Sequence, residues 1–347
     1  MKILEVTGPK RSDATFTNKD YKSENAVRWC PGCGDHAILA SLHKAMAQVG
    51  IAPYDTVVVS GIGCSSRLPY YMNTYGMHTI HGRGAAIATG VKVANPNLSV
   101  WLVSGDGDSM AIGGNHFIHM IRRNVDINMV IVNNKIYGLT KGQYSPTSDR
   151  GFVSKSSPMG TVEDPFIPAE LVFGARGTFF ARTIDVDMSL SQECMVAAAN
   201  HQGASVVEGL VNCMIFNNGT HRIYTDREVR ADRTIVLRHG ERMIYGKDRN
   251  KGIVLDGLEL KSVTIGENGV TEGDILIHDA TTPNPVLHSM LGMMHTQPDM
   301  PIALGVIRNV SGPAYDVEVT NQIREAQAKK PDLHVQDFLN SLSSWEV

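Results

Sequence analysis

The chain has 347 residues, with 32 Lys and Arg against 35 Asp and Glu, and so a formal net charge of −3. With 42% hydrophobic and 19% charged residues, it has the composition of a globular protein of one large or two modest domains, and it is too long for a disulfide-stapled mini-protein. No apolar run approaches the ~18 residues of a membrane helix, and residues 1–30 hold no signal-peptide stretch. The near-neutral charge argues against nucleic-acid binding. We therefore expect a cytoplasmic protein without membrane or nucleic-acid partners.

Alternating helical and strand patterns follow a polar, aperiodic arm at residues 1–25. Apolar residues at helical spacing predict a helix that begins near Asp35 and ends at Gly50, and the β-branched run Thr56–Ser60 predicts a strand buried on both faces. The alternation continues with a helix at about 83–94, a strand at 98–103, a helix at about 115–123, a strand at 127–132, and strands at 178–182 and 205–210 that flank a helix at about 189–201. This order predicts an α/β fold in which helices flank a parallel sheet.

The remaining segments are less regular. Residues 138–173 are rich in Gly, Ser, Thr and Pro, and an aperiodic stretch of this length inside a domain is typical of a functional lid or binding segment. Basic residues outnumber acidic ones over 221–251, which favours a solvated extension or, alternatively, a docking face for an acidic partner. We expect a hairpin around Gly266–Gly269 and helical patches near 321–330. The predicted parts are an arm (1–25), a main domain (26–220) and a C-terminal extension (221–347) that would contact a partner or another subunit.

Glycine-rich segments follow three of the predicted strands, at 61–66, 104–108 (where we expect a turn) and 133–138. Ligands of open parallel sheets bind at such carboxyl ends. A dinucleotide fingerprint fails here, because its third glycine would fall on Met110 or on Ser66, and the sequence has no Walker-type Gly-Lys-Ser/Thr. The sequence therefore supports neither a Rossmann dehydrogenase nor a P-loop enzyme.

A magnesium diphosphate suits these strand ends better. Asp106 offers a carboxylate between two glycines, Asn134 offers an amide oxygen at the end of the next strand, and the carbonyl of Ile136 could complete the protein's share of a Mg²⁺ shell. Gly-Asp-Gly alone is usually just a turn, but Gly-Asp-Gly followed by Asn-Asn after one strand–helix–strand excursion resembles the thiamine diphosphate signature. Nearby, His81 and Arg83 precede a helix amino terminus, where the arginine would either bind a phosphate or carboxylate or simply cap a surface turn.

The sequence has five cysteines, and an odd number in a reducing compartment argues against disulfides. Cys30 and Cys33 form a Cys-x-x-Cys pair. Cys64 lies in the first glycine-rich strand end and Cys213 follows the last strand, so these four can converge at one edge of the sheet. Cys194, in a predicted helix among apolar residues, is expected in the core. Four converging thiolates permit a zinc site, a redox pair or a 4Fe–4S cluster; one pair plus two single ligands favours the cluster, and the adjacent thiamine signature strengthens that preference.

Five ordered motifs carry a family resemblance over about residues 20–220: Trp29-Cys-Pro-Gly-Cys-Gly34, Gly61-Ile-Gly-Cys-Ser65, His81-Gly-Arg83, Gly105-Asp-Gly-Asp108 and Asn133-Asn-Lys-Ile-Tyr-Gly-Leu-Thr-Lys-Gly-Gln-Tyr-Ser-Pro146. Together they resemble the beta subunit of 2-oxoacid:ferredoxin oxidoreductases, and among these the 2-oxoglutarate (2-oxoglutarate synthase) branch. The resemblance implies the fold that binds the diphosphate side of thiamine diphosphate. It also implies coenzyme A-dependent oxidative decarboxylation of 2-oxoglutarate to succinyl-CoA and CO₂, reversible as reductive carboxylation, with electrons passed through a 4Fe–4S cluster to ferredoxin.

The same resemblance assigns residues. Cys30, Cys33, Cys64 and Cys213 would bind one 4Fe–4S cluster. Asp106, Asn134 and the Ile136 carbonyl would bind Mg²⁺. Contacts to thiamine diphosphate would come from Ile62, Gly63, Cys64, Ser65, His81, Gly105, Gly107, Asp108, Gly138 and Leu139.

Two further predictions concern the substrate and the partner. Lys141, at the start of the long loop, would pair with the distal carboxylate of a dicarboxylic 2-oxoacid, unless it is an ordinary loop lysine, and Arg83 would hold an anionic group. Thiamine enzymes also need a glutamate from a pyrimidine-binding domain, which an alpha subunit would supply in αβ or (αβ)₂ assemblies. The alternatives are a beta subunit acting on pyruvate or on 2-oxoacids broadly, a non-redox two-subunit thiamine-dependent 2-oxoacid decarboxylase, and a non-catalytic, metal-stapled interaction subunit.

Overall fold

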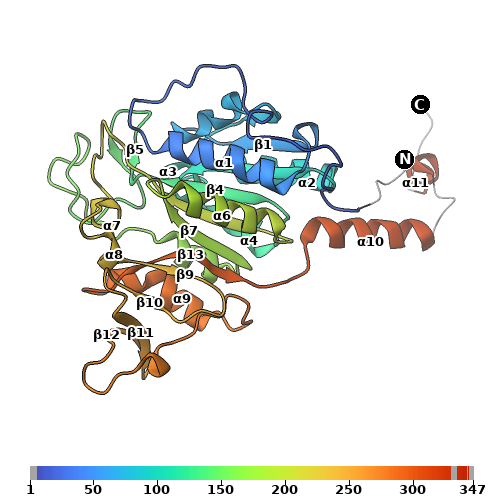
Figure 1. The fold of residues 1–347 in the computed structure, drawn as a ribbon. Coiled ribbons are helices and arrows are strands. Elements are labelled where there is room, and N and C mark those ends of the chain that lie inside the picture. The colour runs from blue at the N-terminus through green and yellow to red at the C-terminus, as the bar shows by residue number, and fades with distance from the viewer. Residues whose placement is uncertain (1–5, 330–333, 342, 344–347) are drawn as a thin grey trace.

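An eight-stranded sheet forms the centre of the molecule (Figure 1). The computed structural model describes residues 6–329, 334–341 and 343. Across the sheet the strands follow the order β2-β1-β3-β4-β8-β7-β13-β9. Their bounds are β1 (Thr56–Ser60), β2 (Tyr75–His78), β3 (Ser99–Gly105), β4 (Asn128–Asn133), β7 (Phe179–Ile184), β8 (Ser205–Leu210), β9 (Thr234–Leu237) and β13 (Ile302–Asn309). All neighbouring strands are parallel except β13 and β7, which confirms the predicted α/β fold with a mostly parallel sheet.

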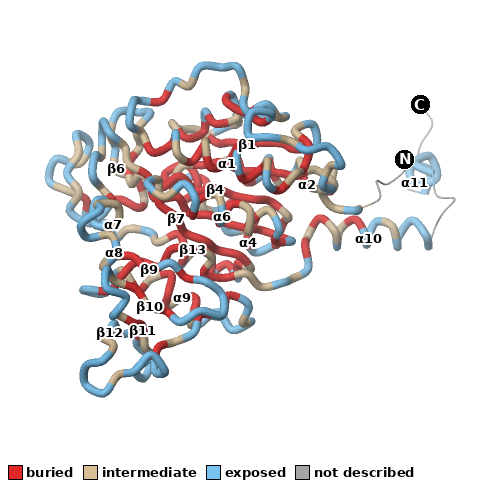
Figure 2. Tube along the Cα trace, in the orientation of Figure 1, coloured by how far each residue is buried: buried red, intermediate tan, exposed pale blue. Residues whose placement is uncertain are grey.

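Side chains along each central strand alternate between hydrophobic cores on the two faces of the sheet. Val57 and Val59 pack in one core, whereas Val58 between them packs in another, because successive strand residues point to opposite faces. The covering helices are α1 (Asp35–Val49) and α6 (Met188–Asn200) on one face, and α2 (Gly84–Ala94), α4 (Gly114–Arg122), α5 (Pro168–Gly174) and α9 (Val286–Met293) on the other. With both faces covered, the strands inside the sheet are almost continuously buried (Figure 2), whereas the edge strand β2 is exposed.

The predicted helices and strands up to residue 210 are confirmed to within a few residues. The strands predicted at Thr56–Ser60 and Ser205–Leu210 have those bounds in the structure. The turn predicted at 104–108 is wrong. Strand β3 continues to Gly105, and a short helix, α3 (Asp106–Met110), begins at the next residue. Asp106 therefore lies in the first turn of a helix whose amino end faces the carboxyl edge of the sheet.

The segment beyond residue 220 shares the central sheet, because β9 and β13 are two of its strands. The domain boundary predicted at residue 220 stays a prediction, although strands from both sides of that residue belong to the same sheet. The remaining elements there are α7 (Arg222–Thr225), α8 (Arg230–Arg233), β10 (Ile244–Tyr245), β11 (Lys251–Asp256), β12 (Glu259–Thr264), α10 (Tyr315–Lys329) and α11 (Val335–Asn340), besides two short 3₁₀ turns. Strands β10, β11 and β12 form a separate small sheet, and α10 extends away from the body (Figure 1).

The hairpin predicted around Gly266–Gly269 is wrong. The hairpin of this region joins β11 to β12, with Asp256 opposite Glu259 and a two-residue turn between them. Gly266–Gly269 instead forms a separate turn after β12, closed by the hydrogen bond from the Gly266 amide to the Val270 carbonyl. Residues 6–25 of the N-terminal arm form no helix or strand, only short turns and an isolated bridge between Lys22 and Met72. In the described part of the chain, no helix combines the length and apolar character needed to cross a bilayer.

Candidate functional site

A cavity of about 390 Å³ lies at the carboxyl ends of β1, β3 and β4, which are neighbours in the sheet. Two further strands, β5 (Ile136–Tyr137) and β6 (Gln143–Tyr144), form a hairpin directly after β4 and supply part of its wall. The structure thus brings together the three glycine-rich strand ends, as the rule for ligand sites in open parallel sheets requires. The lining residues are Ile62, Gly63, Cys64, Ser65, His81, Gly105, Asp106, Gly107, Asp108, Asn134, Ile136, Tyr137, Gly138, Leu139, Thr140 and Gln143.

Every residue predicted to contact thiamine diphosphate lines this cavity, and so do the three predicted Mg²⁺ ligands. Sequence reasoning missed Tyr137, Thr140 and Gln143, which lie within the quoted Asn133–Pro146 motif. Tyr137 donates a hydrogen bond from its hydroxyl to the Gly107 carbonyl over 2.9 Å. A Cβ at Gly107 would lie 2.4 Å from the Tyr137 ring, so a glycine is needed for this contact.

Asp106 is buried at the floor of the cavity. Its Oδ2 accepts hydrogen bonds from the hydroxyls of Ser145, at 2.5 Å, and Thr147, at 2.6 Å. Burial raises the pKa of the Asp106 carboxyl, and the two hydroxyl donors act against that shift. A cation at this carboxylate would favour its ionised form in the same way.

Asn134 and Ile136 are brought beside Asp106 by a tight turn. Lys135 between them has a φ of 55°, in the left-handed region, and the Ile136 amide donates to Asn134 Oδ1 over 3.1 Å. A side-chain oxygen that bonds the backbone two residues on is a typical asparagine turn. This turn brings Asn134 and Ile136 into the lining of the cavity that Asp106 also lines. A carboxylate, an amide oxygen and a backbone carbonyl form the kind of oxygen donor set that Mg²⁺ prefers.

Asp108 connects the loops around the cavity. Its Oδ1 accepts from the Ile62 amide at 3.0 Å and from the Gly82 amide at 2.7 Å, and it lies 2.7 Å from His81 Nδ1. Its Oδ2 accepts from the Ser104 hydroxyl at 2.6 Å. A Cβ at Gly61 would lie 1.7 Å from Asp108 Oδ2, so only glycine fits there. Asp108 therefore fixes the loops after β1 and β2 against the end of β3.

The four cysteines predicted to act together lie close to one another beside the cavity, and none is in a disulfide. A Cβ at Gly138 would lie 3.4 Å from Cys64 Sγ and 3.7 Å from Cys213 Sγ. Cys33 is close enough to Cys213, and Cys64 to Cys30 and Cys213, for thiolates there to interact electrostatically. Burial raises the pKa of Cys33, and it raises that of Cys64 to about 11.

Asp35 lies beside one of these thiols, whereas Cys194 lies in the hydrophobic core. Asp35, expected to start the first helix, is the first residue of α1, and burial beside Cys33 raises its pKa to about 7. Cys194 is buried on α6 with Leu190 and Ala198, which confirms its predicted core position. Within the described ranges, no three His, Cys, Asp or Glu side chains are grouped tightly enough to hold a single metal ion.

Neither residue given a role in catalysis lines the cavity. Lys141 is exposed near the end of the β5–β6 hairpin, with a φ of 75°. Arg83 precedes α2, and its Nη1 lies 3.5 Å from the His81 carbonyl and 3.4 Å from the Ile112 carbonyl, so its guanidinium bonds protein oxygens there. The roles of Lys141 and Arg83 stay predictions.

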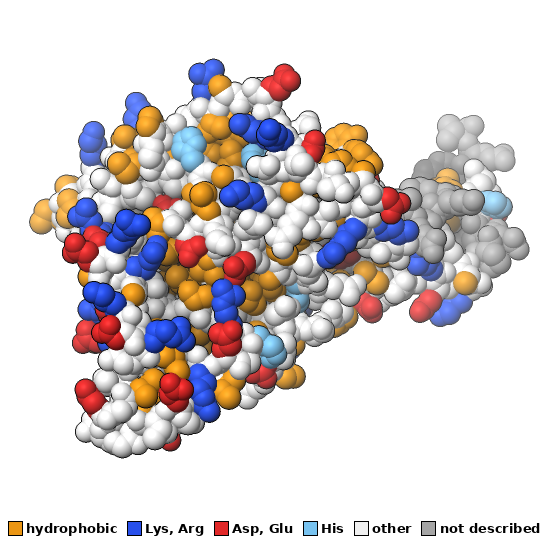
Figure 3. Space-filling model, viewed as in Figure 1, with side chains coloured by type: hydrophobic (Ala, Val, Ile, Leu, Met, Phe, Trp, Pro, Cys, Tyr) orange, Lys and Arg blue, Asp and Glu red, His pale blue; other side chains and the backbone are white. Residues whose placement is uncertain are grey.

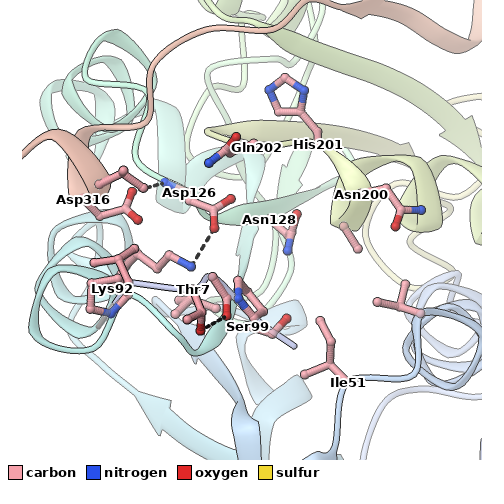
Figure 4. A pocket seen from close by; sticks show the side chains of 18 of the residues that line it. Thr7, Ile51, Lys92, Ser99, Asp126, Asn128, Asn200, His201, Gln202 and Asp316 are labelled. Carbon is pink, nitrogen blue, oxygen red and sulfur yellow. Dashed lines mark hydrogen bonds and ion pairs between the residues drawn. The ribbon is translucent and has the colours of Figure 1, made fainter. Parts of the chain in front are cut away.

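A second cavity, of about 320 Å³, lies at the opposite, amino-terminal ends of the strands (Figure 4). Ser99 and Asn128, the first residues of β3 and β4, line it, with the arm residue Thr7. The buried Lys92 pairs with Asp126 there over 2.6 Å. This cavity contains none of the predicted site residues, and its buried cation already has a carboxylate partner.

Comparisons with known proteins agree with this geometry. The family of the thiamine pyrophosphate enzyme C-terminal TPP-binding domain matches residues 61–209. The 2-oxoglutarate oxidoreductase subunit KorB of Mycobacterium tuberculosis is 42% identical over 347 residues, covering 99% of this chain and 92% of that protein. The 2-oxoacid:ferredoxin oxidoreductase 1 subunit beta of Aeropyrum pernix is 48% identical over 208 residues, 60% of this chain and 65% of that protein.

A solved structure is similar over almost the whole chain. It is the 2-oxoglutarate:ferredoxin oxidoreductase from Magnetococcus marinus with 2-oxoglutarate, coenzyme A and succinyl-CoA bound. The TM-score is 0.76 at 30% identity, and the superposition covers 98% of this chain and 100% of that one. The similarity extends past residue 220, where the family resemblance seen in the sequence ends.

Proposed function

Because the chain belongs to the beta subunits of 2-oxoacid:ferredoxin oxidoreductases, we propose that it binds thiamine diphosphate and, with an alpha subunit, converts 2-oxoglutarate and coenzyme A to succinyl-CoA and CO₂ while reducing ferredoxin. The observation that carries the proposal is the cavity at the strand ends, where the oxygen donors of Asp106, Asn134 and Ile136 lie near four cysteines. When bound, thiamine diphosphate supplies the nucleophilic carbon for decarboxylation and the cluster accepts the electrons one at a time. The chain's own residues bind and orient these groups.

Asp106, Asn134 and the Ile136 carbonyl would hold Mg²⁺, which would supply positive charge for the diphosphate of the cofactor. The fit is supported by a buried carboxylate whose pKa is raised by burial and which a cation would stabilise in its ionised form. Gly63 and Gly105 line the same cavity, where their missing side chains let the backbone approach phosphate oxygens, whereas at Gly107 the Tyr137 ring takes the space of a side chain.

Cys30, Cys33, Cys64 and Cys213 would bind one 4Fe–4S cluster. Ligands must be deprotonated, and burial raises the pKa of the Cys64 thiol to about 11, so a cationic metal centre would have to stabilise the thiolate. Cys64 also lines the thiamine cavity, between Gly63 and Ser65. Cys64 would therefore contact both groups, and this contact would supply a short route for electrons between them.

An alpha subunit would complete the site. Among the described residues that line the cavity there is no glutamate, which is the residue that thiamine enzymes use on the pyrimidine ring. The name of the Aeropyrum relative, a beta subunit, supports such a partner. We propose an αβ or (αβ)₂ complex with coenzyme A, the 2-oxoacid and ferredoxin as its other ligands.

The test is anaerobic purification of the complex and assay of 2-oxoglutarate-dependent ferredoxin reduction. We expect activity only with thiamine diphosphate, Mg²⁺ and coenzyme A, and loss of activity in Asp106→Ala. Activity from the isolated chain would contradict the shared site. Pyruvate is the competing substrate, since the Aeropyrum relative is named for 2-oxoacids broadly. Lys141→Ala should raise KM for 2-oxoglutarate far more than for pyruvate, and equal effects would remove Lys141 from substrate selection.

A further inference from the structure

Part of the long loop is packed under the candidate metal site. The sequence predicts a lid or binding segment over 138–173, yet Ser145 and Thr147 are each only 2% exposed. Ser148 is also buried, and its hydroxyl donates to the Lys135 carbonyl over 2.7 Å. Buried hydroxyls need partners, and here the partners belong to the turn and the carboxylate that form the Mg²⁺ donor set.

The two hydroxyls of Ser145 and Thr147 converge on one oxygen, Asp106 Oδ2. Both are hydrogen bonds to a carboxylate, which are stronger than those between neutral groups. A carboxylate that accepts two bonds on one oxygen is fixed in its rotation about the Cβ–Cγ bond. Its other oxygen is then held in one direction, as a metal ligand requires.

Thr147 has a second acceptor within reach. Its Oγ1 lies 3.0 Å from Asn133 Oδ1, so its single proton can be given to Asp106 or to Asn133. The amide of Asn133 cannot turn over, because its Nδ2 donates to Glu208 Oε1 over 2.8 Å. Glu208 is in turn held by Arg182, whose Nε lies 2.6 Å from Oε2.

The buried Arg182–Glu208 ion pair holds the last residue of this series of contacts in place. The two residues are directly opposite each other on β7 and β8, and both are buried. Arg182 also donates to the carbonyls of Gly292 and Ala303, so its remaining nitrogens are satisfied. Such a pair cannot shift without leaving a buried charge unpaired.

We propose that Ser145 and Thr147 are positioning residues that orient Asp106 for the divalent cation. We further propose that the contact with Asn133, which the buried Arg182–Glu208 pair holds in place, keeps the Thr147 hydroxyl beside Asp106. The inference rests on the proposed function, since it takes Asp106 as a metal ligand. It assigns the Ser145–Ser148 part of the loop to the permanent floor of the site. Outer-shell partners of metal ligands commonly contribute 10- to 100-fold to metal affinity.

The experiment measures Mn²⁺ binding by electron paramagnetic resonance, with thiamine diphosphate present, in the αβ complex. We expect Thr147→Val, which keeps the shape and removes the hydroxyl, to weaken Mn²⁺ binding by roughly 10- to 100-fold. Ser145→Ala should weaken it in the same direction. Thr147→Ser restores the hydroxyl and should bind as the unaltered complex does.

Thr161→Val is the matched control. Thr161 belongs to the same loop and is buried, but its hydroxyl donates to the Asp149 carbonyl, away from Asp106. Unchanged Mn²⁺ affinity in Thr147→Val and Ser145→Ala would overturn the proposal, and so would an equal loss in Thr161→Val. A different result would contradict the proposed function itself. If the Asp106→Ala complex bound Mn²⁺ and thiamine diphosphate as tightly as the unaltered complex does, Asp106 would not be a metal ligand.

Discussion

Asp108→Ala tests whether one carboxylate fixes the loops around the cavity. The Ile62 and Gly82 amides both donate to Asp108 Oδ1, so the substitution leaves both without an acceptor. A hydrogen bond to a charged group contributes about 1.5–3 kcal/mol, and each 1.4 kcal/mol is a tenfold change in an equilibrium. Amide hydrogen exchange at Ile62 and Gly82 should therefore be about 10- to 150-fold faster, measured by mass spectrometry at single-residue resolution.

The neighbouring Thr79 amide is the internal control for this experiment. It donates to the Ser60 carbonyl over 2.9 Å and makes no bond to Asp108, so its exchange should not change. Asp108→Asn is the matched variant, because its amide oxygen can keep the Oδ1 contacts while the Ser104 hydroxyl turns to accept. We expect it to retain most of the protection. Equal acceleration at Thr79, or equal effects of the Ala and Asn variants, would refute the reasoning.

Three further predictions concern the thiols, the buried ion pair and pH. Cys194→Ala should keep the visible iron–sulfur absorbance that Cys64→Ser loses, because Cys194 is a core residue; loss of colour in both variants would contradict the assignment. Glu208→Gln leaves Arg182 charged and buried without its partner, and should lower the free energy of unfolding by about 3–5 kcal/mol in urea titrations. A change near zero would mean that the ion pair does not hold this part of the structure in place. Burial lowers the pKa of His221 to about 4, below its unfolded value of about 6.5. Burying the neutral imidazole therefore contributes its full stability above pH 6.5. About 3 kcal/mol of the free energy of unfolding is lost as the pH falls towards 4. Melting curves between pH 7 and 4 should fall less steeply for His221→Gln, and identical slopes would count against this cause.

Charge on the outer surface follows the basic segment noted in the sequence. Lys and Arg side chains gather over α7 and α8 on the face shown in Figure 3, with a few Asp and Glu among them. Some of these charges are paired, as in Arg233 with Asp299 and Lys251 with Asp232. Both interpretations of this segment, a solvated extension and a docking face for an acidic partner, stay predictions.

Much of the site could be predicted because it depends on local patterns. Buried β-branched runs gave the strands, and the glycines after them marked the strand ends where a cofactor can approach. The positions of Asp106, Asn134 and the four cysteines followed from the motifs at those ends. Tyr137 was missed although it lies in the same motif, because the sequence does not reveal which way a side chain of a two-residue strand points.

The sequence by itself determined the helices and strands up to residue 210, the strand ends that form the cavity, and the kind of ligand they suit. Only the tertiary structure decided that β9 and β13 complete the sheet, that Asp108 connects two loops to the end of β3, and that Ser145 and Thr147 lie beside Asp106. The physical reason is range. Helical and strand periodicity comes from neighbouring residues, whereas these contacts join residues far apart in the chain, and strand order and burial alone bring them within hydrogen-bond distance.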